Sequence, residues 1–353
     1  METQLIDRVR QAVTDGTPLC IQGGGSKAFY GRACLGEPLD VSGHSGDIRY
    51  EPSELVLTAR AGTKLTEIEA LLAANNQMLP FEPPHFSPTA TLGGMVAAGL
   101  SGPRRPWGGS VRDAVLGVKL LNGRGEVLRL GGQVMKNVAG YDLSRLMVGA
   151  LGTLGVLLEV SVKVLPRPAE ERTLVFDLDA ASAAARQIEW GRRPLPLSAT
   201  LYQAGRLHVR LSGSAQGVQA ARAAMGGEEV RSHAGAWERE NLWAEACEQT
   251  LPFFQTDAPL WRVSLPAAAP ALPGECLTEW GGALRWIASD EPAETIRQRA
   301  AALGGHATLF RNHDGMGEAF HPLPPALLAL HKRVKQALDP HGLFNPGRLY
   351  AEL

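Results

Sequence analysis

Three glycines followed by a serine and a lysine, Gly23-Gly24-Gly25-Ser26-Lys27, come directly after a short apolar segment, 18–22, which we expect to be a strand. Consecutive glycines expose backbone N–H groups that can bind an anion, and Ser26 and Lys27 add a hydroxyl and a positive charge. The order Gly-Ser-Lys, with no glycine five residues before the last one, excludes a Walker A loop, and no Rossmann GxGxxG pattern is present. Taken alone, the run also fits a simple tight turn.

Two further glycine-containing segments have the same character. The segment 88–99 mixes glycine pairs with apolar residues, which indicates backbone packed against a flat ligand rather than a linker, since linkers are more polar. The segment 149–156 leads into a strand expected at 156–164. Three such segments fit one extended ligand with a phosphate at its centre better than three unrelated turns. In these two segments the candidate ligand-binding residues are Thr91, Gly93, Gly94, Ala97, Gly99, Gly152, Gly155 and Val156.

Four residues in other segments could bind a substrate or a metal. Arg104 and Arg105 are candidates for a bidentate bond to a substrate carboxylate, and a solvated loop is an equal alternative. His306 and His313 are seven residues apart, a spacing at which imidazoles could bind a divalent metal. No carboxylate-rich motif accompanies these histidines, so we expect them on a polar surface and expect no metal site.

Two more candidates precede the third glycine segment. Lys136 lies within an apolar run and either faces a phosphate or carboxylate or is a surface lysine. Tyr141-Asp142 is expected to be a hydrogen-bonded structural corner rather than an acid–base pair. The sequence does not identify a catalytic residue.

Composition excludes several classes of protein. The chain has 353 residues, of which 35 are Lys or Arg and 36 are Asp or Glu, so bulk charge does not favour nucleic acid or an anionic membrane. No run approaches the roughly 18 apolar residues of a membrane span, and the first residues do not have the pattern of a secretory signal. The four cysteines lie far apart without a CxxC pair, which excludes an iron–sulfur cluster on this chain and indicates a reducing, cytoplasmic setting.

The apolar periodicity predicts alternating elements in the first half of the chain. A helix with Val9 and Val13 on one face opens the chain, and Thr66 followed by Glu69 indicates a capped helix start. The turn sequence 122–125 joins two strands as a hairpin. Strands are expected at 18–22, 55–59, 114–121, 126–130 and 156–164, and helices at 66–75 and 143–148.

The second half mixes strands with alanine-rich helices, which predicts an antiparallel sheet covered by helices. Strands are expected at 173–178, 206–211, 260–265, 283–288 and 306–310, and helices at 180–189, 214–225, 239–249, 292–303 and 326–338. The last helix places Leu327, Leu330, Val334 and Leu338 on one apolar face. We predict an α+β chain with domains at 1–168 and 169–325 and a C-terminal helix and tail, 326–353, that returns to the first domain.

The order of the glycine segments resembles the FAD-binding domain of the vanillyl-alcohol oxidase (PCMH-type) flavoproteins. The tail 338–348, with Asn345-Pro346-Gly347, is similar to the C-terminal signature of the same family, and 23–32 and 131–146 resemble the smaller flavin subunits of bacterial glycolate oxidase (glycolate dehydrogenase). The resemblance implies a domain of two α/β subdomains followed by a smaller antiparallel α+β cap domain. It also implies that Asn345 returns to the flavin.

Departures from the family pattern refine this expectation. Relatives that attach FAD covalently often carry a histidine in the first glycine loop, where this chain has Ser26 and Lys27, so we expect non-covalent FAD. Relatives that oxidise 2-hydroxy acids alone carry a His-x-Gly-Asp-Gly-Asn-type metal motif in the cap, and this chain has no such motif. We therefore expect the chain to oxidise glycolate poorly without partner subunits.

The resemblance implies oxidation of a small 2-hydroxy acid, glycolate, to glyoxylate within a complex. The implied partners are a larger catalytic FAD subunit and an iron–sulfur subunit, together at the inner face of the membrane, with no insertion of this chain into the membrane. One alternative is a self-sufficient FAD-dependent oxidase or dehydrogenase of another 2-hydroxy acid. A third interpretation is a non-catalytic assembly subunit with a vestigial flavin site.

Overall fold

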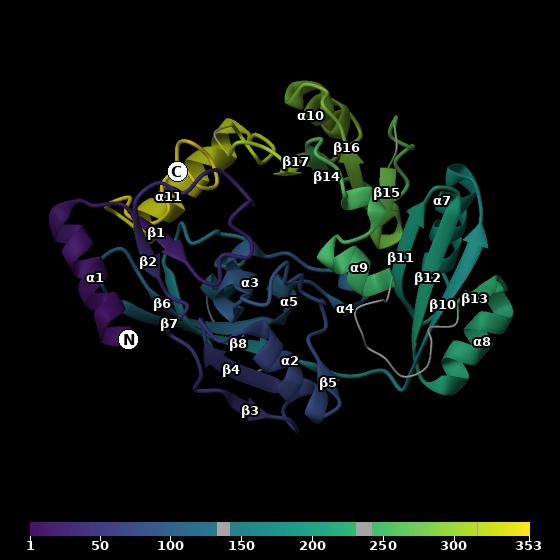
Figure 1. Cartoon of the computed structure of the whole chain (residues 1–353), viewed down its shortest axis with the longest axis horizontal. Helices are drawn as coiled ribbons and strands as arrows, with labels where there is room; N and C mark the ends of the chain where they lie inside the picture. The colour runs from purple at the N-terminus through teal and green to yellow at the C-terminus, as the bar shows by residue number, and fades with distance from the viewer. Residues whose placement is uncertain (133–141, 231–241, 275, 316) are drawn as a thin grey trace. The chain divides into compact units, whose positions relative to one another are not determined.

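The computed structural model describes residues 1–132, 142–230, 242–274, 276–315 and 317–353, and these form two compact units (Figure 1). The first unit contains 1–100, 110–166 and 314–353, and the second contains 101–109 and 167–313. The expected division differs from this one in two ways. The chain returns to the first unit at Asp314 rather than near 326, and the short segment 101–109 belongs to the second unit.

The first unit is built around a five-stranded antiparallel sheet in the order β3-β4-β8-β6-β7. Its strands are β3 (Arg49–Glu51), β4 (Val56–Arg60), β6 (Val115–Leu121), β7 (Val127–Gly131) and β8 (Val156–Lys163). A parallel pair, β1 (Leu19–Gln22) and β2 (Glu37–Asp40), and an antiparallel pair, β5 (Gln77–Met78) and β9 (Leu165–Pro166), complete its strands. Its helices are α1 (Glu2–Asp15), α2 (Leu65–Ala74), α3 (Leu92–Ala98), α5 (Val111–Ala114), α6 (Leu143–Leu146) and α11 (Pro325–Leu338).

The three central strands of the first unit's sheet, β4, β8 and β6, are mostly buried, whereas the edge strands β3 and β7 are largely exposed. In strand β8, buried and exposed residues do not alternate, and only Glu159 and Lys163 of its eight residues are partly exposed. Asn122 organises the predicted turn between β6 and β7, since its side-chain oxygen accepts hydrogen bonds from the N–H groups of Arg124 and Glu126. The hairpin predicted from 122–125 is therefore confirmed.

The C-terminal tail returns to the beginning of the first unit. Leu19 of β1 forms a parallel bridge with Phe344, which lies in the tail that follows the yellow helix α11 of Figure 1. Both residues are fully buried in one core cluster. The first and last parts of the chain thus fold together.

Two details of the predicted helices are wrong. Helix α2 begins at Leu65 after Lys64, with no side-chain cap, so Thr66 lies inside the helix instead of capping it. In α11 only Val334 and Leu338 of the predicted apolar face pack against the core, while Leu327 and Leu330 are exposed. The buried residue of α11 is Lys335, whose ammonium group has three acceptors.

The second unit is an eight-stranded antiparallel sheet in the order β13-β10-β12-β11-β15-β16-β14-β17, with helices packed on it. Its strands are β10 (Glu170–Asp177), β11 (Leu197–Gln203), β12 (Arg206–Gly213), β13 (Glu228–Val230), β14 (Leu260–Ser264), β15 (Cys276–Glu279), β16 (Leu284–Ala288) and β17 (His306–Arg311). Its helices are α4 (Arg105–Gly108), α7 (Ala180–Gly191), α8 (Ala215–Met225), α9 (Leu242–Glu248) and α10 (Ala293–Ala302), with 3₁₀ turns at Pro252–Phe254 and Trp280–Gly282. The α+β class and the antiparallel sheet are as predicted.

Candidate functional site

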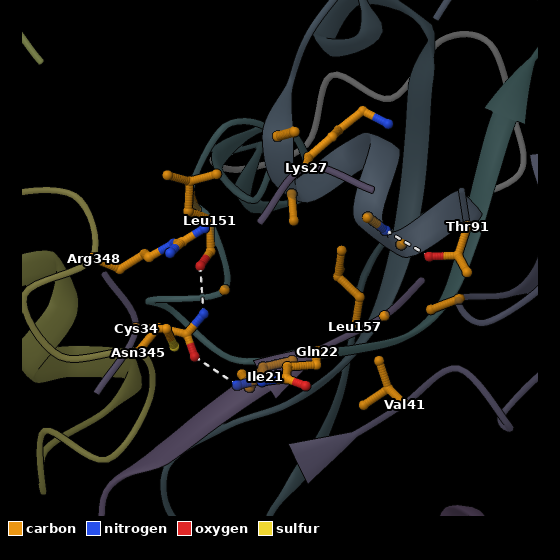
Figure 2. Close-up of a pocket in the computed structure, with 18 of the residues that line it drawn as sticks. Ile21, Gln22, Lys27, Cys34, Val41, Thr91, Leu151, Leu157, Asn345 and Arg348 are labelled. Carbon is orange, nitrogen blue, oxygen red and sulfur yellow. Dashed lines mark hydrogen bonds between the residues drawn. The ribbon is translucent and has the colours of Figure 1, made fainter. Parts of the chain in front are cut away.

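A cavity in the first unit brings the three glycine segments and the C-terminal tail together (Figure 2). It encloses about 1200 Å³ of space free of protein atoms, part of which is open to solvent. Four segments form its walls: the loop after β1, the first turn of α3, the loop before β8, and the tail at Asn345 and Arg348. The sequence separates these segments by up to about 320 residues, so only the fold brings them together.

The loop after β1 forms one wall, and Gly24 is the tightest position in it. A side chain at Gly24 would place its Cβ 1.6 Å from the backbone oxygen of Thr89. The Thr89 hydroxyl also donates a hydrogen bond to the Gly24 carbonyl. Glycine at this position therefore permits two loops to touch. Gly25 differs, because its φ of +71° lies in the left-handed region while a Cβ there would meet nothing within 4 Å.

Helix α3 begins at a second wall of the cavity. Thr91 caps it, since its hydroxyl accepts a hydrogen bond from the Gly94 N–H at 3.2 Å. A Cβ at Gly93 would lie 2.8 Å from Cβ of Ala61, and one at Gly94 would lie 3.1 Å from Oγ1 of Thr91. The sequence predicted a close approach of this backbone to a ligand, but its helical conformation was not foreseen.

Asn345 connects two walls of the cavity from the C-terminal tail. Its side-chain oxygen accepts a hydrogen bond from the Ile21 N–H at 2.7 Å, and its amide donates to the Leu151 carbonyl at 2.6 Å (Figure 2). Gly152 leaves room for this amide, because a Cβ there would lie 2.7 Å from Nδ2 of Asn345. Both polar ends of the Asn345 side chain are thus occupied by protein backbone. The role that the structure gives it is to position the walls.

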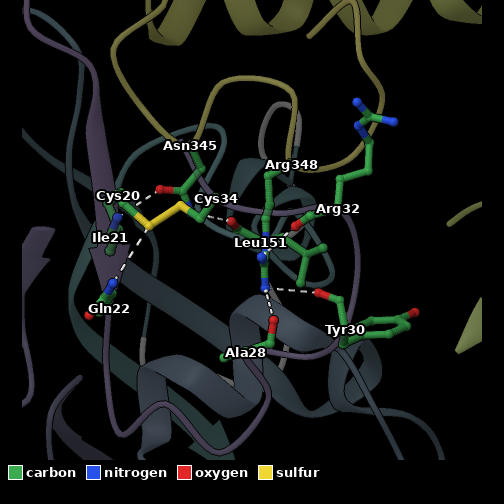
Figure 3. Close-up of a disulfide and its surroundings, with 10 residues drawn as sticks. All are labelled: Cys20, Ile21, Gln22, Ala28, Tyr30, Arg32, Cys34, Leu151, Asn345 and Arg348. Atoms are coloured by element: carbon green, nitrogen blue, oxygen red, sulfur yellow. Dashed lines mark hydrogen bonds between the residues drawn. A yellow bond between two sulfur atoms is a disulfide. The ribbon is translucent and has the colours of Figure 1, made fainter. Parts of the chain in front are cut away.

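The electrostatics of the cavity favour an anion. Among the described residues, those that line the cavity include two cations, Lys27 and Arg348, and no aspartate or glutamate. The Arg348 guanidinium donates hydrogen bonds to the carbonyls of Ala28, Tyr30 and Arg32 (Figure 3), and burial lowers its pKa from the ordinary value. The Lys27 ammonium lies 3.3 Å from both the Ser26 hydroxyl and the His85 carbonyl.

A disulfide joins Cys20 and Cys34 at the edge of the same cavity, with their Cα atoms 5.8 Å apart (Figure 3). Cys20 lies on β1, and Cys34 lies 14 residues later at the end of the loop that contains the glycines. This pairing was not predicted from the sequence, in which the spacing of the cysteines was used only to exclude an iron–sulfur cluster and to infer a reducing setting. Fourteen residues are enough for the chain to turn and return to its starting strand.

Most of the predicted ligand-binding residues line the cavity, and two do not. The lining residues include Gly23, Gly24, Gly25, Ser26, Lys27, Thr91, Gly93, Gly94, Ala97, Gly152, Gly155 and Asn345. Gly99 ends α3 with a φ of +65°, and a Cβ there would lie 2.9 Å from the Gly149 nitrogen, so it permits close backbone packing. Val156 is fully buried in the core with Leu121 and Phe344. Sequence reasoning missed Arg348, Cys20 and Cys34 as residues of the cavity.

The remaining candidates lie elsewhere or outside the described residues. Arg104 is buried in the second unit and bonds to Glu171 at 2.6 Å, which corrects both the substrate role and the solvated loop. Arg105 stacks over the Trp280 ring at 4.6 Å. His306 is exposed at the start of β17, and no group of three or more His, Cys, Asp or Glu side chains suited to a metal occurs in the described part of the chain.

Two candidates before the third glycine segment have different outcomes. Lys136 and Tyr141 lie outside the described residues. Asp142 accepts a hydrogen bond from the Arg145 N–H and thereby caps α6.

None of the helices in the described ranges is both long and apolar enough to cross a bilayer.

The cavity fits a dinucleotide with a flat aromatic ring system and a pyrophosphate. The consecutive glycines of the first loop can present backbone N–H groups to phosphate oxygens, and the two cations Lys27 and Arg348 can balance phosphate charge. Apolar side chains, including Val41, Leu154 and Leu157, supply the walls that a ring system requires.

Comparisons with known proteins agree with this fit. The family described as "FAD binding domain" matches residues 1–131, and the family described as "FAD linked oxidases, C-terminal domain" matches residues 296–349. The chain is 53% identical to the glycolate oxidase subunit GlcE of Escherichia coli (strain K12), over 99% of this chain and 97% of that protein. It is 34% identical to the glycolate oxidase subunit GlcD of Bacillus subtilis (strain 168), over 39% of this chain and 30% of that protein.

A more distant relative and a solved structure extend the comparison. The D-lactate dehydrogenase of Archaeoglobus fulgidus is 28% identical over 51% of this chain and 41% of its own length. The structure of alkyldihydroxyacetonephosphate synthase matches with a TM-score of 0.68 and 16% identity, over 98% of this chain and 75% of that one. At this identity the structural match shows a shared fold only.

Proposed function

The chain belongs to the family of FAD-linked oxidoreductases that includes the glycolate oxidase subunit GlcE, and we propose that it is the FAD-binding subunit of a multi-subunit glycolate oxidase (dehydrogenase). Its reaction is the oxidation of glycolate to glyoxylate, with transfer of two electrons to FAD. The implied partners are a larger catalytic FAD subunit and an iron–sulfur subunit. We place the chain in the cytoplasm, with any contact to the inner membrane made through these partners.

The observation that carries the proposal is that both matched segments meet in one cavity. The glycine loop and α3 lie in the first matched segment, and Asn345 and Arg348 lie in the second. The bond between Asn345 and Ile21 joins the two segments at the cavity wall. A cofactor bound there would contact residues from both segments, as a single FAD site requires.

The residues present account for how FAD would be held. The backbone N–H groups of the first glycine loop, with Ser26, Lys27 and Arg348, would bind the pyrophosphate. The apolar lining excludes water from the rings. When bound, FAD supplies a two-electron acceptor for the C–H bond of the alcohol carbon.

The lining residues also favour non-covalent binding. Covalent attachment of a flavin requires a nucleophilic side chain, and the cavity-lining residues within the described ranges include no histidine or tyrosine. Its two cysteines, Cys20 and Cys34, are joined to one another. We therefore propose that FAD is held by hydrogen bonds, charge and packing alone.

Electrons would leave this subunit through a partner. An iron–sulfur cluster needs about four thiolate ligands, and outside the disulfide the chain has only Cys247 and Cys276. We assign the second unit as the cap or substrate-type domain, and no residue is assigned to proton removal from the substrate.

The proposal is tested by purifying the chain, denaturing it and measuring the flavin released. We expect close to one FAD per chain, and glycolate oxidation with a dye acceptor that rises strongly when the partner subunits are added. Full turnover by the chain alone would favour the self-sufficient oxidase. Absence of bound or bindable FAD would leave only the non-catalytic assembly subunit.

A further inference from the structure

We propose that Cys20 and Cys34 form a reversible redox site, opened by low-molecular-weight thiols, whose state sets how tightly the cavity holds FAD. This inference rests on the proposed function, because it assumes that FAD occupies the cavity. It adds a site of thiol–disulfide exchange that the oxidation of glycolate does not require.

The position of the disulfide is the first argument. Both cysteines line the cavity, and they enclose the segment 21–33, which contains the whole first glycine loop. Glycine-rich backbone has many conformations when it is free, so ordering Gly23, Gly24 and Gly25 for a ligand is entropically costly. A covalent bond across the base of the segment removes part of that freedom before the ligand binds.

Non-covalent contacts also hold residues 28–32 of the same segment, which follow the glycines. Arg348 donates to three carbonyls between Ala28 and Arg32, and the Arg32 side chain donates to the Gly347 carbonyl at 2.9 Å. These contacts do not depend on the disulfide. Opening it would therefore loosen the glycine loop without unfolding the unit, and the loss of FAD affinity would be partial.

The chemistry needs only a thiol that cells contain in quantity, such as a tripeptide thiol. A thiolate attacks one sulfur of the Cys20–Cys34 bond, the second sulfur leaves as a thiol, and a second small thiol resolves the mixed disulfide. Two protein thiols and one small-molecule disulfide result, and two electrons are transferred. Disulfides in a reducing compartment are usually transient or redox-sensing, which agrees with a reversible bond in the proposed cytoplasmic location.

The remaining cysteines provide an internal comparison. Cys247 and Cys276 form no disulfide and lie in the second unit. Burial raises the pKa of the Cys276 thiol, which disfavours the reactive thiolate. Redox sensitivity of the cavity is therefore assigned to one pair of cysteines.

Linkage makes the inference reciprocal. If the disulfide form binds FAD more tightly by some factor, bound FAD must favour the disulfide over the dithiol by the same factor. This relation connects two independent measurements, FAD affinity and the thiol–disulfide equilibrium, and neither depends on enzyme turnover.

The test titrates FAD into the FAD-free full chain by flavin fluorescence, after oxidation and after reduction with dithiothreitol. We expect about tenfold weaker binding in the reduced form, and an equal shift in a glutathione redox titration with and without FAD. Cys34→Ser should bind like the reduced chain and ignore dithiothreitol. The matched control Cys276→Ser should respond like the native chain.

Three results would overturn the inference: equal FAD affinity in both redox states, no Cys20–Cys34 bond in a thiol count under oxidising conditions, or a Cys34→Ser variant that still responds to dithiothreitol. Circular dichroism of the reduced chain and of Cys34→Ser separates a loosened loop from loss of the fold. If FAD binds neither form, the proposed function itself fails. Equal binding to both forms rejects only the redox site.

Discussion

The side-chain oxygen of Asn345 accepts a hydrogen bond from the backbone N–H of Ile21 at 2.7 Å, although 324 residues separate the two in sequence. The amide of the same side chain donates to the Leu151 carbonyl at 2.6 Å. One buried side chain thus joins β1, the loop before β8 and the tail, all of which border the cavity. Its φ of +41° also suits asparagine, which tolerates left-handed backbone better than most residues.

Replacement of Asn345 tests this connection. Asn345→Leu leaves the Ile21 N–H and the Leu151 carbonyl without their partner, at roughly 1–3 kcal/mol for each group. We expect a lower free energy of unfolding by urea and weaker FAD binding. Asn345→Asp keeps the acceptor for Ile21 and tolerates the same φ, but it turns a carboxylate oxygen toward the Leu151 carbonyl, so we expect it to lose stability as well and to bind the anionic FAD more weakly. A leucine variant as stable as the native chain would show that the bonds hold no part of the cavity.

The glycine segments were predictable because glycine is required where backbone has a positive φ or where two segments touch, and both conditions leave a trace in composition. The same reasoning cannot tell a ligand from protein as the close neighbour. At Gly99 the neighbour is Gly149, and at Gly24 it is the backbone of Thr89. The first residue therefore lies off the cavity, and the second lies on it partly for a structural reason.

Long-range pairs of polar residues were not predictable. Arg348 bonds to backbone carbonyls, which every residue carries, so no sequence pattern identifies its partners. Arg104 finds its carboxylate 67 residues away on β10. The amphipathic pattern of α11 was wrong for a related reason. A buried lysine is favourable only when acceptors surround it, and one acceptor of Lys335, the Thr153 carbonyl, lies 182 residues away in sequence.

Lys335 and Asp339 form such a buried pair. The Lys335 ammonium bonds to the Asp339 carboxylate at 3.0 Å and to the carbonyls of Thr153 and Phe344. The carboxylate in turn accepts hydrogen bonds from the N–H groups of Leu343 and Phe344. The pair thereby fixes the start of the tail.

We expect Lys335→Met to lower the free energy of unfolding by about 3–5 kcal/mol, because it leaves a buried carboxylate without its cation. The double variant Lys335→Met with Asp339→Asn should lose less than the sum of the two single variants. Urea unfolding of the four proteins measures the coupling free energy. Strict additivity would mean that the pair does not interact in the folded chain.

Substitution by alanine is predicted to have a large effect at Gly24 and a small one at Gly25. Gly24→Ala brings Cβ into the Thr89 carbonyl and forces two cavity loops apart, so we expect FAD binding to be lost or reduced more than a hundredfold. Gly25→Ala meets no atom and adds only the left-handed strain, of about 1–2 kcal/mol. FAD titration of both variants, with thermal unfolding as the check on the fold, distinguishes them. Equal effects would contradict the assigned loop geometry.

His44 predicts part of the pH dependence of stability. Burial lowers its pKa from the ordinary value of 6.5; Arg60, Lys119 and the N-terminus lower it further, and Glu2 opposes them. Just below pH 6.5 the unfolded chain therefore binds a proton at His44 that the folded chain does not. The contribution of neutral His44 to the free energy of unfolding is therefore complete above pH 6.5 and is lost as the pH falls. The slope of this loss is at most ~1.4 kcal/mol per pH unit.

The variant His44→Gln removes this titration. We expect the free energy of unfolding in urea to fall less between pH 7.5 and pH 5.5 for the variant than for the native chain. The comparison isolates one group, because all other titratable side chains are the same in both proteins. Parallel pH profiles would refute a role for the buried imidazole.

Lys27 predicts how FAD binding depends on salt. With Arg348 it is one of two cations among the cavity-lining residues that the structure describes, and its ammonium is held toward Ser26 and His85. A hydrogen-bonded charge pair with a phosphate contributes about 1.5–3 kcal/mol, so Lys27→Met should weaken FAD binding by roughly 10- to 150-fold. The remaining affinity should fall less steeply between low and high salt, because one screened interaction has been removed.

Lys332→Met, on the exposed face of α11, is the matched control for Lys27→Met and should change neither the FAD affinity nor its salt dependence. Titration of FAD at two ionic strengths measures both effects, and a Lys27→Met variant with native affinity would place the phosphates away from the first glycine loop.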